Sequence, residues 1–160
     1  MTTKAGDKVP SAKLKTMTKD GIKDLTTDDI FKGKKVAIFG LPGAFTPTCS
    51  AKHLPGFVQH FDALKAKGVD TVACVSVNDA FVMDAWGKAQ NVGDKVLMLA
   101  DGNAEFTKAL GIEMDGTAYG MGLRMKRFSM YVVDGTVKSF NLEKPGAFEV
   151  SNAETMLGQI

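Results

Sequence analysis

An apolar run that ends in a turn rich in glycine and proline most constrains how this chain can fold. The run covers Val36–Leu41, Pro42-Gly43 follow it, and a helix-compatible stretch begins near Cys49. This order predicts a buried strand, a turn at its carboxyl end and a helix over 49–67, which Pro55 should kink or break. We therefore expect a thiol in the first turn of a helix, just beyond the end of a central strand.

The rest of the chain alternates between strand and helix patterns. This order predicts an α/β fold, with a central mixed sheet flanked by helices and an antiparallel hairpin at one edge. The further strands that we expect lie over 69–77 and 95–100, with one hairpin around Lys19-Asp20-Gly21 and another formed by strands 128–133 and 136–142 around Asp134-Gly135. An Asp-capped turn is expected at 28–31, a helix over 103–110 closed by Gly111, and a last helix over 152–158. A helix over 79–90 should be capped by Asp79, and its inner face should hold Phe81, Val82, Ala85 and Trp86.

Length and composition favour one soluble globular domain over residues 1–160, with 44% hydrophobic and 24% charged residues. A formal net charge of +2 is too small to argue for nucleic acid, and no apolar run approaches the roughly 18 residues of a membrane span. No secretory signal is visible. Two cysteines cannot form a disulfide framework, and no Cys/His set has zinc-site spacing. The simplest location is the cytoplasm, where free thiols survive.

The segment Thr46-Pro47-Thr48-Cys49 has the composition of a helix start. Thr46 suits the N-cap and Pro47 the first helical position, which puts Cys49 in the first turn. Backbone N–H groups there lack helical partners and the helix dipole is positive, so the thiolate is favoured. The Thr46 hydroxyl is expected to donate to the sulfur or to a bound ligand, and Pro42 to limit solvent around it.

A helix start alone cannot activate a cysteine at neutral pH. An ordinary cysteine, with a pKa of about 8.5, is only roughly 3% thiolate at pH 7, and a pKa of about 6 would take about 3.4 kcal/mol. The dipole supplies roughly 0.3–1 kcal/mol, so a cation is needed. Arg127, before the 128–133 strand, is the best candidate, with Arg124 and Lys126 as competitors. The residues alone also allow the segment Arg124-Met125-Lys126-Arg127 to be a solvated basic turn.

Two other residues have structural and functional interpretations. Cys74 lies within the apolar strand over 69–77, where a buried structural thiol is expected. His53 follows Cys49 by one helical turn. It would be in place to act as a base, but a surface or packing histidine is the simpler interpretation.

The residues around Cys49 resemble the peroxiredoxins, and among them the type II group that includes the atypical two-cysteine members. The family signature P-x-x-x-T-x-x-C is matched by Pro42, Thr46 and Cys49. The resemblance assigns the family's active-site arginine to Arg127 and implies a thioredoxin-like fold. Further similar stretches are Lys52–Phe57, Val75–Phe81 with Trp86, and Lys126–Met130.

The resemblance implies an antioxidant thiol peroxidase that reduces hydrogen peroxide and alkyl hydroperoxides. It makes Cys49, Thr46, Arg127 and Pro42 catalytic, with Cys49 as the peroxidatic residue and Pro42 as a shield against over-oxidation. Thr46, Thr48, Cys49 and Arg127 would bind the substrate. No metal or other cofactor is implied, since a thiol supplies the electrons. A homodimer is expected, with Phe45 and Trp86 near its interface.

One departure from the family concerns recycling. The stretch over 146–151 lacks the resolving cysteine that mammalian-like atypical members carry near the C-terminus. Cys74 matches a second cysteine of plant type II enzymes, but a thiol inside a central strand should not reach Cys49 without local unfolding. The prediction is a one-cysteine cycle, in which glutathione or glutaredoxin reduces the Cys49 sulfenic acid and thioredoxin is the second choice.

Two other functions fit the same fold. A disulfide oxidoreductase of thioredoxin type is disfavoured because Thr46 stands where a Cys-x-x-Cys pair needs its first cysteine. Insulin reduction measured beside peroxide consumption separates these two activities. A non-catalytic binding module would instead have an ordinary, slowly reacting Cys49.

Overall fold

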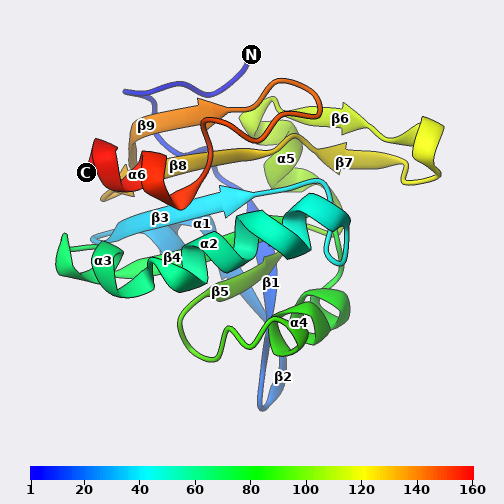
Figure 1. The fold of residues 1–160 in the computed structure, drawn as a ribbon, viewed down its shortest axis with the longest axis horizontal. Coiled ribbons are helices and arrows are strands. Elements are labelled where there is room, and N and C mark those ends of the chain that lie inside the picture. Colours follow the sequence, from blue (N-terminus) through cyan, green and yellow to red (C-terminus); the bar gives the residue numbers. More distant parts are fainter.

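The computed structural model describes residues 1–160 and shows a seven-stranded mixed sheet in the order β2-β1-β5-β4-β3-β8-β9 (Figure 1). The predicted α/β fold with helices on a central sheet is confirmed. The strands of this sheet are β1 (Lys13–Thr18), β2 (Gly21–Thr26), β3 (Lys35–Gly40), β4 (Thr71–Ser76), β5 (Leu97–Ala100), β8 (Phe128–Val133) and β9 (Thr136–Leu142).

Three central strands set the position of the site. Strands β3, β4 and β5 run parallel, so their carboxyl ends lie at the same edge of the sheet. Strand β8 is antiparallel to β3, and it therefore begins at the same edge where β3 ends, with Gly40 opposite Phe128. A Cβ at Gly40 would lie 2.3 Å from the Phe128 ring, so only glycine allows this approach. The residues after Gly40 and before Phe128 are thereby brought together.

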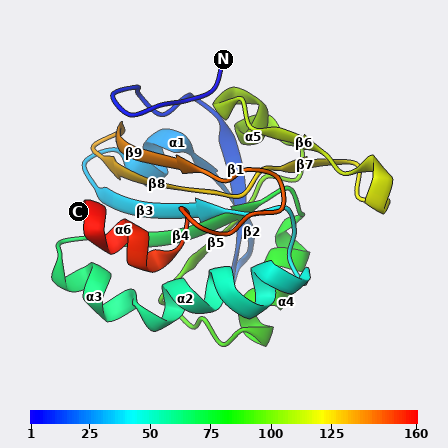
Figure 2. The same cartoon turned by 45° about the horizontal axis from the view of Figure 1, so that its top comes forward.

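Helices cover both faces of the sheet (Figure 2). On one face α2, α3, α4 and α6 pack against a core that includes Phe57, Leu64, Trp86 and Met156. On the other face α1 and α5 pack through a second core. The helices are α1 (Thr27–Phe31), the π-helical segment η1 (Cys49–His53), α2 (Leu54–Gln59), α3 (Phe61–Ala66), α4 (Ala80–Ala89), α5 (Glu105–Leu110), the 3₁₀ turn η2 (Thr117–Tyr119) and α6 (Ala153–Gln159).

Most expected elements are present. The β1–β2 and β8–β9 hairpins, the Asp79 cap of α4 and the left-handed Gly111 that ends α5 are as predicted. The helix predicted over 49–67, with a break at Pro55, is present as three segments, η1, α2 and α3. The wide π turn ends just before Pro55, which has no N–H for a helical bond, and the second break falls at His60.

Three details of the prediction were wrong. Helix α1 is capped by Thr26, whose hydroxyl accepts from the Asp29 N–H, and not by an aspartate. On α4, Phe81 and Ala85 face outward, because the buried residues are Ala80, Met83, Trp86 and Gly87. A two-stranded ribbon, β6 (Glu113–Asp115) and β7 (Leu123–Met125), was not expected and projects from the body of the molecule (Figure 1). None of the helices is long and apolar enough to cross a bilayer.

Candidate active site

The turn after β3 closes into a helix start as its sequence predicts. The chain is helical from Pro47, and the Ser50 N–H donates to the Thr46 carbonyl at 2.9 Å. The Thr46 hydroxyl donates to the Gly43 carbonyl at 2.6 Å. We expected this hydroxyl to donate to the Cys49 sulfur or to a bound ligand, but its hydrogen is directed at Gly43. Its lone pairs stay available to accept a hydrogen bond.

Arg127 contacts the sulfur directly. Its Nη2 donates to Cys49 Sγ at 3.1 Å, and its Nη1 donates to His53 Nδ1 at 2.9 Å. The sulfur is fully buried, and burial alone would favour a neutral thiol. A guanidinium at hydrogen-bonding distance opposes this effect, because it stabilises the negative charge of a thiolate. The predicted approach of a cation to Cys49 is therefore present.

His53 lies on the sheet side of η1 and not on the molecular surface. It is fully buried, and its Nε2 lies 2.9 Å from the Ser151 carbonyl. A carbonyl only accepts, so Nε2 carries the hydrogen and Nδ1 keeps the lone pair that receives Arg127. Burial, helped by the charge of Arg127, lowers the pKa of His53 to about 3. His53 is thus neutral, and its Nδ1 lone pair orients Arg127 by accepting a hydrogen bond from it. Because that lone pair is engaged, His53 cannot serve as a base.

A buried carboxylate fixes the loop that carries Ser151. Burial raises the pKa of Glu143, but four hydrogen bonds outweigh that effect and hold the pKa below its usual value. The donors to Glu143 Oε2 are the N–H groups of residues 149, 150 and 151 and the Ser151 hydroxyl, at 2.7–2.8 Å. Phe148 of this loop packs against His53 and Arg127. A continuous series of contacts therefore connects Glu143 to Cys49.

The other two basic candidates have different positions. Arg124 donates from Nη1 to the Pro42 carbonyl at 3.2 Å and from Nε to the Met121 carbonyl at 3.0 Å, which ties β7 to the turn before Cys49. Lys126 lines a small cavity beside Arg127 together with Pro42. Of the three basic residues, Arg127 is the one that contacts the sulfur. The alternation of side chains along a strand did not identify it in advance.

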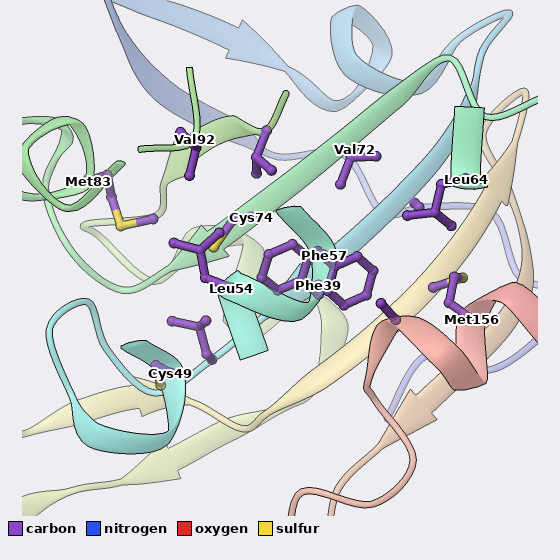
Figure 3. Packing of buried hydrophobic residues seen from close by; sticks show 14 of the residues in the cluster. Phe39, Cys49, Leu54, Phe57, Leu64, Val72, Cys74, Met83, Val92 and Met156 are labelled. Atoms are coloured by element: carbon purple, nitrogen blue, oxygen red, sulfur yellow. The ribbon is translucent and has the colours of Figure 1, made fainter. Parts of the chain in front are cut away.

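Cys74 has the opposite environment. It lies in β4, fully buried among apolar side chains, whereas Cys49 lies at the edge of the same packing (Figure 3). Burial raises the pKa of Cys74 well above its ordinary value, which favours the unreactive thiol, as expected for a structural cysteine. No group of three or more His, Cys, Asp and Glu side chains is placed to hold a metal ion.

The residues expected near a dimer interface differ in exposure. Trp86 is fully buried, and its indole N–H donates to the Ser50 hydroxyl at 3.1 Å, so it supports the helix start from within and is not an interface residue. Phe45 is 57% exposed and has a left-handed φ of 63°. Phe81, expected in the core, is 66% exposed.

These features define a redox protein of thioredoxin-like fold with one thiol held against a cation. The chain matches the Redoxin family over residues 4–157. It is 52% identical over 157 residues to peroxiredoxin-2E-2 of Oryza sativa, covering 95% of this chain and 70% of that protein, and 44% identical to peroxiredoxin-2B of Arabidopsis thaliana, covering 95% and 94%. Reduced Prx3 of Vibrio vulnificus, solved in complex with hydrogen peroxide, superposes with a TM-score of 0.93 at 55% identity over 96% of each chain.

The chain therefore belongs to the peroxiredoxins, in their type II group, and is a thiol-dependent peroxidase. The resemblance that the sequence indicated is confirmed, as are its fold and its enzyme class. This enzyme class differs from both alternatives considered above, a disulfide oxidoreductase of thioredoxin type and a non-catalytic binding module.

The neutral His53 predicts a pH dependence of stability. An unfolded chain binds a proton at His53 below about pH 6.5, whereas the folded chain resists it until about pH 3. The unfolded state therefore binds more protons in this window, and the free energy of unfolding should fall as pH is lowered, approaching about 1.4 kcal/mol per pH unit. Urea unfolding of His53→Asn should show a shallower slope between pH 6.5 and 4.

The matched control is His60→Asn, at the partly exposed histidine that pairs with Glu154, and it should not make the slope shallower. If His53→Asn and the parent lose stability equally over this range, His53 is not held neutral by the fold.

Proposed function

We propose that Cys49 is the peroxidatic residue and that Arg127 activates it. The observation that carries this proposal is the 3.1 Å contact from the guanidinium to Sγ. The thiolate attacks the nearer oxygen of a hydroperoxide, a sulfur–oxygen bond forms and the O–O bond breaks. The leaving oxygen departs as hydroxide or alkoxide and takes a proton, while Cys49 becomes a sulfenic acid. Hydrogen peroxide and alkyl hydroperoxides can both react in this way, because the bond that breaks is the same.

The substrate oxygens would be held by groups around the sulfur. Arg127 would donate to the oxygen on which charge develops, and the backbone N–H of Cys49, in the first helical turn, would be a second donor. The lone pairs of the Thr46 hydroxyl accept the O–H of the peroxide, since its own hydrogen is engaged by Gly43. Thr48 and Pro42 line a cavity together with Arg127, and Pro42 would shield the sulfenic acid from further oxidation.

The finer proposal is a cycle with one redox-active cysteine. It is supported by the sequence of the 143–151 loop, which holds no thiol, and by the burial of Cys74. Glutathione or glutaredoxin is the favoured reductant, and thioredoxin is the second choice. Such a cycle depends on a supply of reduced thiols, which supports a cytoplasmic location.

Cysteine variants test the proposed cycle. Cys49→Ser should lose peroxide turnover completely, because a serine hydroxyl is not ionised at neutral pH. Cys74→Ser should keep most of the turnover, because that thiol is buried and un-ionised. The measurement is peroxide consumption with glutathione and glutaredoxin, and with thioredoxin and its reductase. A Cys74→Ser variant as inactive as Cys49→Ser would contradict a one-cysteine cycle.

We also propose a homodimer. Support comes from two exposed aromatic side chains, Phe45 and Phe81, in adjoining segments that the Ala44 N–H joins by donating to Asn78 Oδ1 at 3.0 Å. In sedimentation velocity, Phe81→Glu should shift the protein from dimer to monomer, since a charge would be buried unpaired. Tyr119→Glu, at an exposed aromatic residue of the turn between β6 and β7, should leave the dimer intact. A monomeric parent protein would end this proposal.

A further inference from the structure

A small cavity lined by Arg127, the residue that contacts the Cys49 sulfur, is not explained by the peroxide reaction alone. Its volume is about 140 Å³, and it shares Pro42, Thr48 and Arg127 with the site around Cys49. The remaining walls come from Lys126 and from the start of the 143–151 loop. At roughly 30 Å³ for each water-sized oxygen, this cavity is about twice as large as one peroxide oxygen pair requires.

The cavity has an excess of positive charge. Lys126 and Lys144 line it, and neither takes part in a salt bridge in this structure. Glu143 is the one acid in the lining, and its Oε2 is turned to the 149–151 backbone and the Ser151 hydroxyl. Two lysines and an arginine therefore line a cavity in which no lining carboxylate pairs with the lysines, which favours an anionic occupant.

We propose that this cavity holds the carboxylate end of the small thiol that recycles Cys49. The inference rests on the proposed one-cysteine cycle, in which the second sulfur must come from outside the chain. A thiol that carries a carboxylate would place its charge on Lys126 and Lys144 while its sulfur approaches Cys49 past Arg127. Residues 144–147 form one wall of the cavity. Glu143 directly precedes this segment and is held in place by its hydrogen bonds to residues 149–151.

The chemistry of this step is balanced without another reactant. The incoming thiolate attacks the Cys49 sulfenic acid, a sulfur–sulfur bond forms and the sulfur–oxygen bond breaks, and the oxygen leaves as water after taking a proton. The sulfenic sulfur is reduced and the incoming sulfur is oxidised. A second thiolate then attacks the mixed disulfide at the reagent's sulfur, which releases a disulfide and restores the Cys49 thiolate.

Thiols of different charge test the assignment. Stopped-flow fluorescence of Trp86, whose indole N–H donates a hydrogen bond to Ser50 next to Cys49, follows oxidation by hydrogen peroxide and then reduction by each thiol. The reagents are 3-mercaptopropionate, 2-mercaptoethanol and cysteamine, with rates corrected for the thiolate fraction of each. The anionic reagent should reduce the sulfenic acid faster than the cationic one, by about 2- to 30-fold for two exposed ion pairs. Added salt should diminish the difference.

A pair of double variants separates local charge from total charge. Lys126→Gln with Lys144→Gln should abolish the preference for the anionic thiol. Lys108→Gln with Lys138→Gln removes the same charge from exposed positions that do not line the cavity, and should keep the preference.

The two proposals fail in different ways in this experiment. Slow oxidation of Cys49 by peroxide in the parent protein would overturn the proposed function. Fast oxidation followed by reduction that ignores the charge of the thiol, or a preference that survives loss of Lys126 and Lys144, would overturn the cavity assignment alone.

Discussion

The contact between the Arg127 guanidinium and the buried sulfur of Cys49 is the interaction on which the site depends. A sulfur with no exposed surface would be expected to remain a neutral thiol, because low polarity penalises its ionised form. A unit charge about 4 Å away is worth about 4 kcal/mol at the effective dielectric of a protein, several times the contribution of a helix terminus. The proposed activation of a buried Cys49 therefore depends on the presence of this cation.

The surrounding structure holds the Arg127 guanidinium through an imidazole that stays uncharged. His53 receives Arg127 through a lone pair that exists only while the imidazole is neutral, and burial keeps it neutral. Ser151 fixes the His53 tautomer, and the ionised Glu143 fixes Ser151 through its backbone and its hydroxyl. The wide π turn from Cys49 to His53 brings both side chains to the same guanidinium, as π segments often do at functional sites.

Local sequence patterns predicted the central elements and the cysteine at the end of β3, because these depend on apolar runs and on the capping preferences of threonine and proline. The partners of Arg127 were less accessible. His53 is four residues from Cys49, a spacing that puts two side chains on one helical face, but its burial depends on Phe148 and Ser151, roughly a hundred residues away in sequence. The outward turn of Phe81 was missed because an apolar pattern does not distinguish a core from a surface that another molecule would cover.

The most direct measurement is the ultraviolet absorbance of the Cys49 thiolate, recorded near 240 nm on reduced protein at neutral pH in a Cys74→Ser background. The account predicts close to one thiolate per chain, and its loss when Arg127 is replaced by glutamine in a chain that remains folded. An absorbance that is absent from the parent, or that is the same with and without the guanidinium, would contradict the claim that Arg127 ionises the sulfur.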